Sequence, residues 1–201
     1  PALLQPAYGL AALAFFFLTQ TTYQPSTADN FIEKDVPNNN FGSDIQIRIR
    51  DSATYNLRTL IYFDISDIPD GMTFSQGDLS IYQYNTAIGG TGRINRLTRT
   101  NWTELGSTWN KYDGTHNWTT AGGDYTSTNS VATDCSSNGW KTWYASDLIQ
   151  DCYDNQSKEV HLIIVGENGV YNRMYSRDYT DNTSLRPKLT VTYNCLLYTS
   201  D

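Results

Sequence analysis

Two arginines lie at alternate positions of one short segment, where they could bind an anionic ligand. Arg48 and Arg50 alternate with Ile45, Ile47 and Ile49, and this period of two is typical of a strand with one apolar and one polar face. Guanidinium groups on the polar face could pair with uronate carboxylates through two parallel hydrogen bonds. The alternative is a solvated strand face with ordinary surface charges. We take Arg48 and Arg50 as candidate ligand-binding residues.

A second run of arginines invites the same hypothesis. Arg93, Arg96 and Arg99 lie in a segment that also contains Ile94 and Leu97. Pointing both apolar residues toward one core would require a bulge in the strand. The faces of these three arginines are therefore not assigned from the sequence.

The tryptophans differ in how accessible we expect them to be. Trp118 lies in a glycine-rich loop, where it could stack on a pyranose ring or anchor its own loop, and we take it as a candidate ligand-binding residue. Trp102 and Trp109 are expected to pack in the core. Trp140 and Trp143 fall on opposite faces of a short strand, so at most one of them should be exposed.

A catalytic reading would need two carboxylates at a fixed separation. Glu104, Asp113 and Asp124 are the candidates, and a glycosidase pair requires about 5 Å or about 6.5–9.5 Å between the two groups. Nothing in the sequence fixes such a separation, and both aspartates lie beside glycines in turns. His116 has no nucleophile next to it, and no G-x-S-x-G motif is present. We expect no catalytic residues and no enzyme activity.

Metal binding is weakly indicated. Calcium prefers several oxygen ligands that loops bring together, and four side chains could supply them: Asp29, Asp35, Asn38 and Asp44. Such residues more often cap their own backbone in turns. We therefore expect no metal and no other cofactor.

The three cysteines do not have the spacing of zinc ligands. Cys135, Cys152 and Cys195 are scattered, and the two histidines, His116 and His161, lie far apart in sequence. In an exported protein, a Cys135–Cys152 bridge would stabilise the fold by roughly 3 kcal/mol. Two unpaired thiols, at least one of them buried, are the open alternative.

The composition is typical of an extracellular β-protein, and the net charge argues against a nucleic-acid partner. Only 17% of the 201 residues are charged, and neutral polar residues are abundant, which is unusual for a cytosolic enzyme. The net charge of −7 lacks the basic footprint that a phosphate backbone requires. A chain of this length is sufficient for one domain with a substantial core.

The two ends of the chain carry separate expectations. Residues 1–20 are uncharged, and their apolar run of about ten residues is too short to span a bilayer, so we interpret them as the remnant of an export signal or anchor. A strand or tail belonging to an upstream region is the alternative. Residues 195–201, CLLYTSD, match one reading frame of a sequencing-library adapter, and we interpret them as an adapter-derived tail.

The elements that position these residues are predicted to be strands. The segment Asn56–Gly71, NLRTLIYFDISDIPDG, carries large side chains on both faces and ends in a turn, so it should be a central strand. Thr21–Gln24 and Phe31–Ile32 are expected to form one first strand broken at Pro25, and Ser146 should cap a brief helix. Nine or ten short strands and one short helix predict an all-β, two-sheet antiparallel sandwich, most simply a jelly roll.

Five motifs in this order resemble the DNRLRE-type carbohydrate-binding module across residues 21–194. They are QPSTADNFIE with PNNNFG, RTLIYFDISDIPDG, GDLSIY, NWTELGSTWN and SRDYTDNTSLRPKLTVTY. Two departures from the family pattern are Asp78, in place of the usual alanine, and the long polar insert at 118–125. The resemblance implies a jelly-roll domain of secreted or surface proteins, and its motifs look like core and turn positions, so no family binding residue is carried over.

The expected function is therefore non-catalytic polysaccharide binding by a secreted or surface-attached protein. Acidic polymers suit the two candidate arginines, and we expect no nucleic-acid partner and no membrane span in the domain. The alternative is a structural or adhesive domain of a viral fibre, surface layer or extracellular filament. A flat, basic, aromatic-lined face around Arg48 and Arg50 would favour glycan binding over a spacer role.

Overall fold

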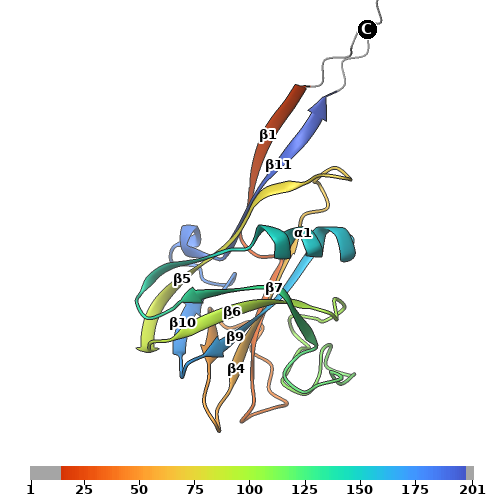
Figure 1. The fold of residues 1–201 in the computed structure, drawn as a ribbon. Coiled ribbons are helices and arrows are strands. Elements are labelled where there is room, and N and C mark those ends of the chain that lie inside the picture. Colours follow the sequence, from red (N-terminus) through yellow and green to blue (C-terminus); the bar gives the residue numbers. More distant parts are fainter. Residues whose placement is uncertain (1–14, 198–201) are drawn as a thin grey trace, which may run out of the picture.

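The computed structural model describes residues 15–197, which form an antiparallel β structure with one α-helix (Figure 1). The strands are β1 (Phe15–Tyr23), β2 (Ala28–Glu33), β3 (Gln46–Arg50), β4 (Leu57–Asp64), β5 (Phe74–Ile88), β6 (Thr91–Leu97), β7 (Tyr125–Asp134), β8 (Gly139–Tyr144), β9 (Glu159–Glu167), β10 (Tyr171–Tyr175) and β11 (Lys188–Leu197). The helix α1 spans Ser146–Asn155, and a 3₁₀ turn spans Thr183–Leu185.

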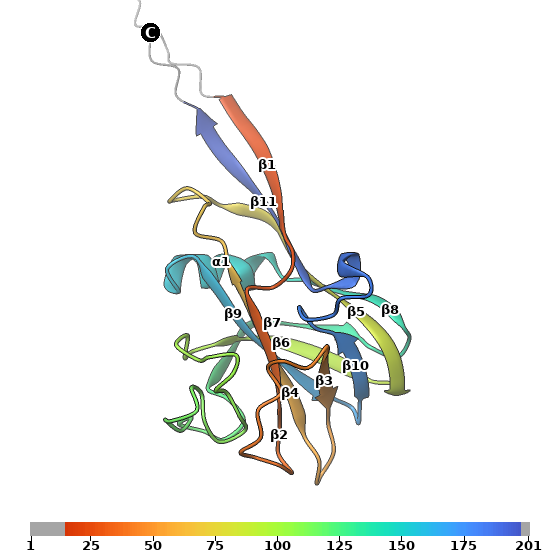
Figure 2. The same cartoon turned by 180° about the vertical axis from the view of Figure 1, so that it is seen from behind.

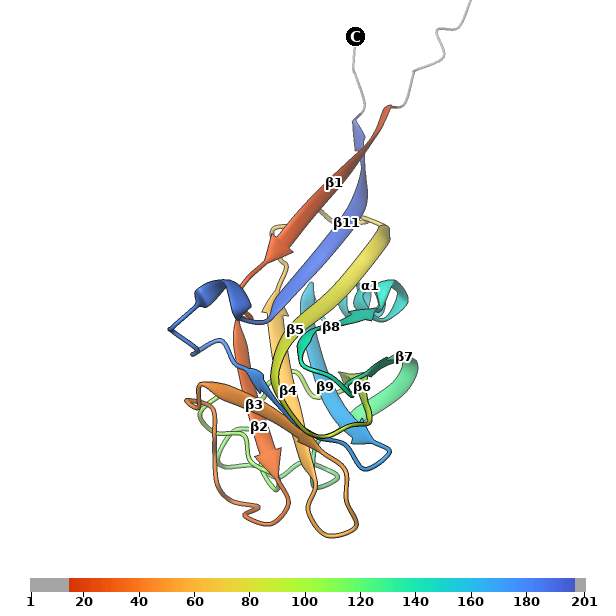
Figure 3. The ribbon, with the colours of Figure 1, turned by 90° about the vertical axis from the view of Figure 1, so that its left-hand side faces the viewer.

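The strands form two layers that are joined at one corner (Figure 3). One layer runs β1-β11-β5-β10-β3, with β8 on the other edge of β5. The second layer runs β4-β9-β6-β7, with β2 on the other edge of β4. A single pair, Arg50 with Leu57, links β3 to β4, so the layers belong to one curled sheet. The predicted all-β antiparallel sandwich is confirmed.

Strand β4 is buried on both faces, as its sequence predicted. Ile61 and Phe63 face the main core between the layers, whereas Leu60 faces a second apolar cluster on the outer side. All three side chains have no exposed surface. Because β4 pairs with β2 on one edge and β9 on the other, it is a central strand.

The long segment between β6 and β7 covers the outer side of β4 and β9. Its rings make half of the second apolar cluster, and Trp102 and Trp109 are each only 7% exposed, which confirms that they pack in the core. Trp102 also donates a hydrogen bond from Nε1 to Nδ1 of His161, at 3.0 Å. In Figure 2 this segment folds into loops beside β2 and β4.

The helix α1 closes one end of the main core. Leu148, Ile149, Cys152 and Tyr153 are its buried residues, as expected for a short amphipathic helix. The predicted cap is wrong by one position: Ala145 is the N-cap, and no side-chain hydrogen bond caps the helix. Its first turn carries Asp147, which suits the helix dipole.

The first predicted strand is in fact two strands in different layers. The chain turns at Pro25, so that β1 pairs with β11 and β2 pairs with β4. The β1–β11 ribbon projects away from the body in Figure 1. The ladder reaches from the Phe15–Leu197 pair to Tyr23–Leu189, so Phe15–Gln20 and Cys195–Leu197 continue it. The interpretations of residues 1–14 and 198–201 as signal remnant and tail lie outside the described residues.

Two of the cysteines are unpaired in the core. Cys135 and Cys152 are both free and fully buried. The Cys135–Cys152 bridge considered from the sequence is therefore not formed in this structure. Burial raises the pKa of the Cys135 thiol to about 11 and also raises that of Cys152. Both thiols are therefore protonated and act as small apolar groups.

No helix within residues 15–197 combines the length and the apolar character needed to cross a bilayer.

Candidate functional site

The outer side of β3, β10, β5 and β8 carries arginines and aromatic rings together. We call this surface the strand face, and it comprises Arg48, Arg50, Tyr82, Tyr84, Trp140, Tyr171, Arg173 and Tyr175. Its side chains point outward because their neighbours in sequence, such as Ile47, Ile49 and Met174, are buried in the main core. Arg48 and Arg50 thus share one outward face. Ile45, expected on the apolar face, precedes β3 and is 53% exposed.

Aromatic rings hold the three arginines of the strand face. The Arg50 guanidinium lies between the rings of Tyr55 and Tyr171, at 4.9 and 4.8 Å from their centroids. Arg173 lies 5.7 Å from the Tyr171 ring centroid, and its Nη2 donates to the Tyr171 hydroxyl at 3.2 Å. Such cation–π contacts fix long side chains that would otherwise sample many rotamers.

Arg48 is more enclosed than Arg50. It lies over the Phe31 ring at 4.7 Å, and its Nη2 is 3.6 Å from Oδ2 of Asp44. Its side chain is 23% exposed. In the antiparallel ladder Arg48 pairs directly with Arg173, so two like charges lie side by side across β3 and β10. Like charges at such a pair repel each other, and an anion between them would relieve the repulsion.

Stacked rings continue the strand face toward β8. Tyr175 stacks on Tyr84 at 4.6 Å and on Tyr179 at 3.6 Å, and it lies 5.9 Å from Tyr82. Trp140 then meets Tyr82 edge-on at 5.6 Å. The Trp140 ring is 37% exposed whereas Trp143 is fully buried, which confirms that only one of the two is accessible.

The strand face is basic within an acidic molecule. Within residues 15–197, Arg48, Arg50 and Arg173 face one ion-pairing carboxylate, Asp44, and Lys188 lies over Trp140 at 4.3 Å from its centroid. The whole chain, by contrast, carries −7. Burial raises the pKa of Tyr84 although Arg173 and Arg48 oppose that shift, so its hydroxyl stays neutral and donates to Oε1 of Gln46. The face therefore offers positive charge, neutral donors and flat rings.

Trp118 lies away from this face, and its ring is not accessible. It is 4% exposed, belongs to the second apolar cluster and donates from Nε1 to the carbonyl of Thr108 at 2.9 Å. The expectation that Trp118 could stack on a sugar is therefore corrected. The ring anchors its own loop, which was the alternative considered from the sequence. Its glycine-rich surroundings indicated a loop correctly but did not reveal that the ring turns inward.

The second run of arginines is engaged in ion pairs. Arg93 pairs with Glu167 at 2.6 Å, and Arg96 pairs with Asp151 at 2.6 Å. Ile94 and Leu97 are both buried, but no bulge turns them toward one core as expected. Ile94 faces the main core and Leu97 faces the second cluster, and β6 keeps unbroken register with β9. The irregularity lies in the pairing of β6 with β7.

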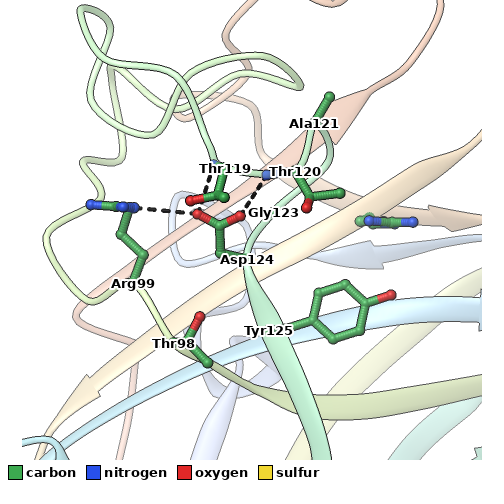
Figure 4. A pocket seen from close by; sticks show the side chains of 9 residues that line it. Thr98, Arg99, Thr119, Thr120, Ala121, Gly123, Asp124 and Tyr125 are labelled. Carbon is green, nitrogen blue, oxygen red and sulfur yellow. Dashed lines mark hydrogen bonds and ion pairs between the residues drawn. The ribbon is translucent and has the colours of Figure 1, made fainter.

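The three carboxylates weighed as catalytic residues are each bonded to different groups. Glu104 accepts from the Asp29 amide at 2.9 Å, and its other oxygen lies 3.6 Å from Nη1 of Arg177. Asp113 caps a turn and pairs with Nδ1 of His116 at 2.7 Å. Asp124 accepts from the amides of its own loop and from Nε of Arg99 at 3.3 Å (Figure 4). Each carboxylate thus acts as a structural acceptor.

Three of the four candidate calcium ligands are engaged with separate partners, and the fourth lies on the surface. Asp29 is buried and accepts from Ser26 Oγ at 2.6 Å, and Asp44 pairs with Arg48. Asn38 accepts from Asn110, and Asp35 is exposed. No cluster of three or more acidic, histidine or cysteine side chains with metal-binding geometry occurs among residues 15–197.

Several residues of the strand face were not singled out from the sequence. Tyr171, Arg173 and Tyr175 alternate with Asn172 and Met174 in the same period-two pattern as β3. This alternation could have identified them. The pairing of β10 with β3 joins segments that are far apart in sequence, so no local pattern could predict it.

The fold is an antiparallel β-sandwich whose strand face gathers arginines and aromatic rings, and comparison with known families adds the class of protein. The family model described as Carbohydrate-binding module family 96 matches residues 20–193, most of the chain. This match makes the molecule a carbohydrate-binding module. The chain belongs to carbohydrate-binding module family 96. A search of curated proteins finds no significant match.

Proposed function

We propose that the domain holds a polysaccharide, preferably an acidic one, on the strand face and catalyses no reaction on it. The observation that carries this proposal is the juxtaposition of Arg48, Arg50 and Arg173 with tyrosine and tryptophan rings on one outward surface. Guanidinium forks bind carboxylates in a bidentate manner, and the flat apolar faces of sugar rings stack on aromatic side chains.

The same surface separates this role from that of a spacer or filament subunit. A structural domain would have no need to gather arginines on one face of an acidic molecule. Four strands at about 4.8 Å spacing give the face a width of roughly 14 Å, sufficient for an extended oligosaccharide to cross it. A flat face of this kind suits an internal segment of a polymer.

We further propose that the module is of the DNRLRE type and works in a secreted or surface-attached protein. The ordered motifs support the first part, because RTLIYFDISDIPDG forms the central strand β4 and the turn after it. The neutral polar composition supports the second. The separate structural roles of Glu104, Asp113 and Asp124 support a binding function without catalysis.

The test removes both predicted arginines. We expect Arg48→Ala with Arg50→Ala to weaken retention on polygalacturonate in affinity electrophoresis by about tenfold or more, since a hydrogen bond between charged groups contributes about 1.5–3 kcal/mol. The melting temperature should fall by several degrees while the domain stays folded, because the three lost cation–π contacts contribute about 0.5–1 kcal/mol each.

The matched control is Arg93→Ala, which removes one positive charge paired with Glu167. It should leave retention nearly unchanged. If the double variant is retained as well as the wild type, Arg48 and Arg50 are not in the site. If the isolated domain shortens the polymer, the non-catalytic assignment fails.

A further inference from the structure

A hollow on the other side of the molecule contains a partly buried arginine that has no acidic partner among residues 15–197. It has a volume of about 610 Å³ and lies where the long loop returns to β7, lined by Arg58, Thr98, Arg99, Thr119, Thr120, Ala121, Gly123, Asp124 and Tyr125. Arg58 comes from the central strand β4, and the other residues come from the end of β6, the loop and the start of β7. Figure 4 shows Arg99 and Tyr125 on either side of Asp124.

The unusual group in this hollow is the Arg58 guanidinium. It lies over the rings of Trp109 and Tyr125, at 5.0 and 5.5 Å from their centroids, and its Nη1 donates to the carbonyl of Gly122. Among residues 15–197, no carboxylate lies within ion-pairing distance of it. Burial lowers the pKa of Arg58. A cation that is partly withdrawn from water without a counter-charge is destabilising, so the site favours an added anion.

The loop is shaped to bring its backbone against this group. Gly122 has φ +92°, and a Cβ there would lie 2.8 Å from Nη1 of Arg58 and 2.7 Å from the Trp109 ring. Only glycine fits this close approach. The guanidinium is therefore held on one side by the backbone and by two rings, while the other side borders the hollow.

Asp124 cannot neutralise Arg58, because its oxygens are already engaged. Oδ2 accepts from the Thr119 amide and from Arg99, and Oδ1 accepts from the Thr120 amide. Burial alone would raise the pKa of Asp124, but these hydrogen bonds outweigh it and lower the pKa. Asp124 thus stays ionised and pairs with Arg99. One positive charge, that of Arg58, remains unbalanced in the hollow.

We propose that this hollow is a second binding site, which takes one carboxylate-bearing sugar unit, with Arg58 pairing to the carboxylate and Tyr125 contacting the ring. Tyr125 is 37% exposed and supplies the apolar contact, and three threonines supply hydroxyl groups around it. The inference rests on the proposed polysaccharide binding for the class of ligand only. A hollow takes a single unit, such as a chain end, whereas the strand face takes an extended segment.

The test uses NMR titration of the ¹⁵N-labelled protein with sodium D-galacturonate, and with D-galactose as the uncharged parallel. Galacturonate should produce saturable shifts at the Arg58 Nε–H and at the amides of Gly122, Gly123 and Asp124. Galactose should bind about tenfold more weakly or worse, since it lacks the carboxylate that would pair with Arg58. Equal responses to the two sugars, or no response of these signals to galacturonate, would overturn the proposal.

Variants separate this site from the strand face. Arg58→Gln should abolish the galacturonate shifts, whereas Arg93→Gln and the Arg48→Ala, Arg50→Ala double variant should keep them. Should Arg58→Gln unfold the loop, Arg58→Lys and Tyr125→Ala test the same contacts, and each is expected to weaken binding about tenfold. A folded Arg58 variant that binds like the wild type would refute the site. Polymer retention that depends on Arg48 and Arg50, without any galacturonate response, would leave the strand face standing alone.

Discussion

Buried ionisable side chains connect separate parts of this domain, whereas the arginines of the strand face point outward. His161 is an example: Nδ1 accepts from Trp102, Nε2 faces Oε2 of Glu159 at 2.9 Å, and the ring stacks on Tyr62 at 4.2 Å. Burial lowers the pKa of His161 although Glu159 opposes the shift. The neutral imidazole therefore connects the loop that covers β4 to strand β9.

Asp29 is the carboxyl whose burial has the largest consequence. Its Oδ2 accepts from Ser26 Oγ and from the Arg177 amide, and it ties β2 to the segment after β10. Burial raises the pKa of Asp29 to about 7, although both hydrogen bonds lower it. The folded state therefore holds a proton that the unfolded chain releases near its ordinary pKa of 3.8.

The sign of the pH effect follows from this difference. Asp29 contributes stability that is complete below pH 4 and is lost as pH rises toward 7, with a slope of up to about 1.4 kcal/mol per pH unit. Above the folded pKa both states are ionised and the loss levels off. Asp29→Asn mimics the protonated acid and should remove this dependence. Urea unfolding of both proteins from pH 4.5 to 8.5 checks it, and a pH-independent difference in unfolding free energy would refute it.

At the same scale, the sequence predicted part of the strand face. Arg48 and Arg50 could be placed on one face because period-two alternation is local. Arg58 could not be singled out from the sequence. Its surroundings depend on Gly122, which lies 64 residues away and folds against the guanidinium. Trp118 was misjudged for the same reason: whether a loop ring turns in or out is decided by what lies beneath the loop.

Among the elements, β4 determines how the others are arranged. One face of β4 packs in the main core and the other packs in the second apolar cluster. The layer that contains β4 is therefore covered on both sides, by the opposite layer and by the loop between β6 and β7. Large side chains on both faces of Asn56–Gly71 made this readable from the sequence. The sequence did not predict that the first strand is split into β1 and β2. Whether each part pairs with β11 or with β4 is decided by residues far away in sequence.

Truncation of the central strand should therefore be costly. Phe63 has no exposed surface and lies in the main core, so Phe63→Ala should reduce the free energy of unfolding by about 3–5 kcal/mol. Tyr144→Ala, at a position that is 74% exposed, is the control and should change it by no more than about 0.5 kcal/mol. Chemical denaturation measures both. A loss below about 1 kcal/mol for Phe63→Ala would contradict the central position of β4.

For the molecule as a whole, net charge and local charge have opposite signs. The chain carries −7, while the strand face gathers Arg48, Arg50 and Arg173 against one carboxylate of the part of the chain that the structure describes, Asp44. Under the proposed function, an acidic polymer is repelled by the net charge of the domain at long range and attracted by the strand face at short range. The range of each force is set by salt: the Debye length is about 30 Å at 0.01 M, about 10 Å at 0.1 M and about 3 Å at 1 M.

Retention on polygalacturonate should consequently pass through a maximum as salt increases. Near 0.01 M the net charge acts across the domain and opposes binding, whereas near 0.1 M it is screened and the arginine contacts persist. Near 1 M the contacts themselves weaken. Affinity electrophoresis across this range measures the curve, with a neutral polysaccharide as the control that should show little change. A steady fall from the lowest salt would mean that the net charge plays no part, and a flat curve would mean that the arginines do not contact the polymer's carboxylates.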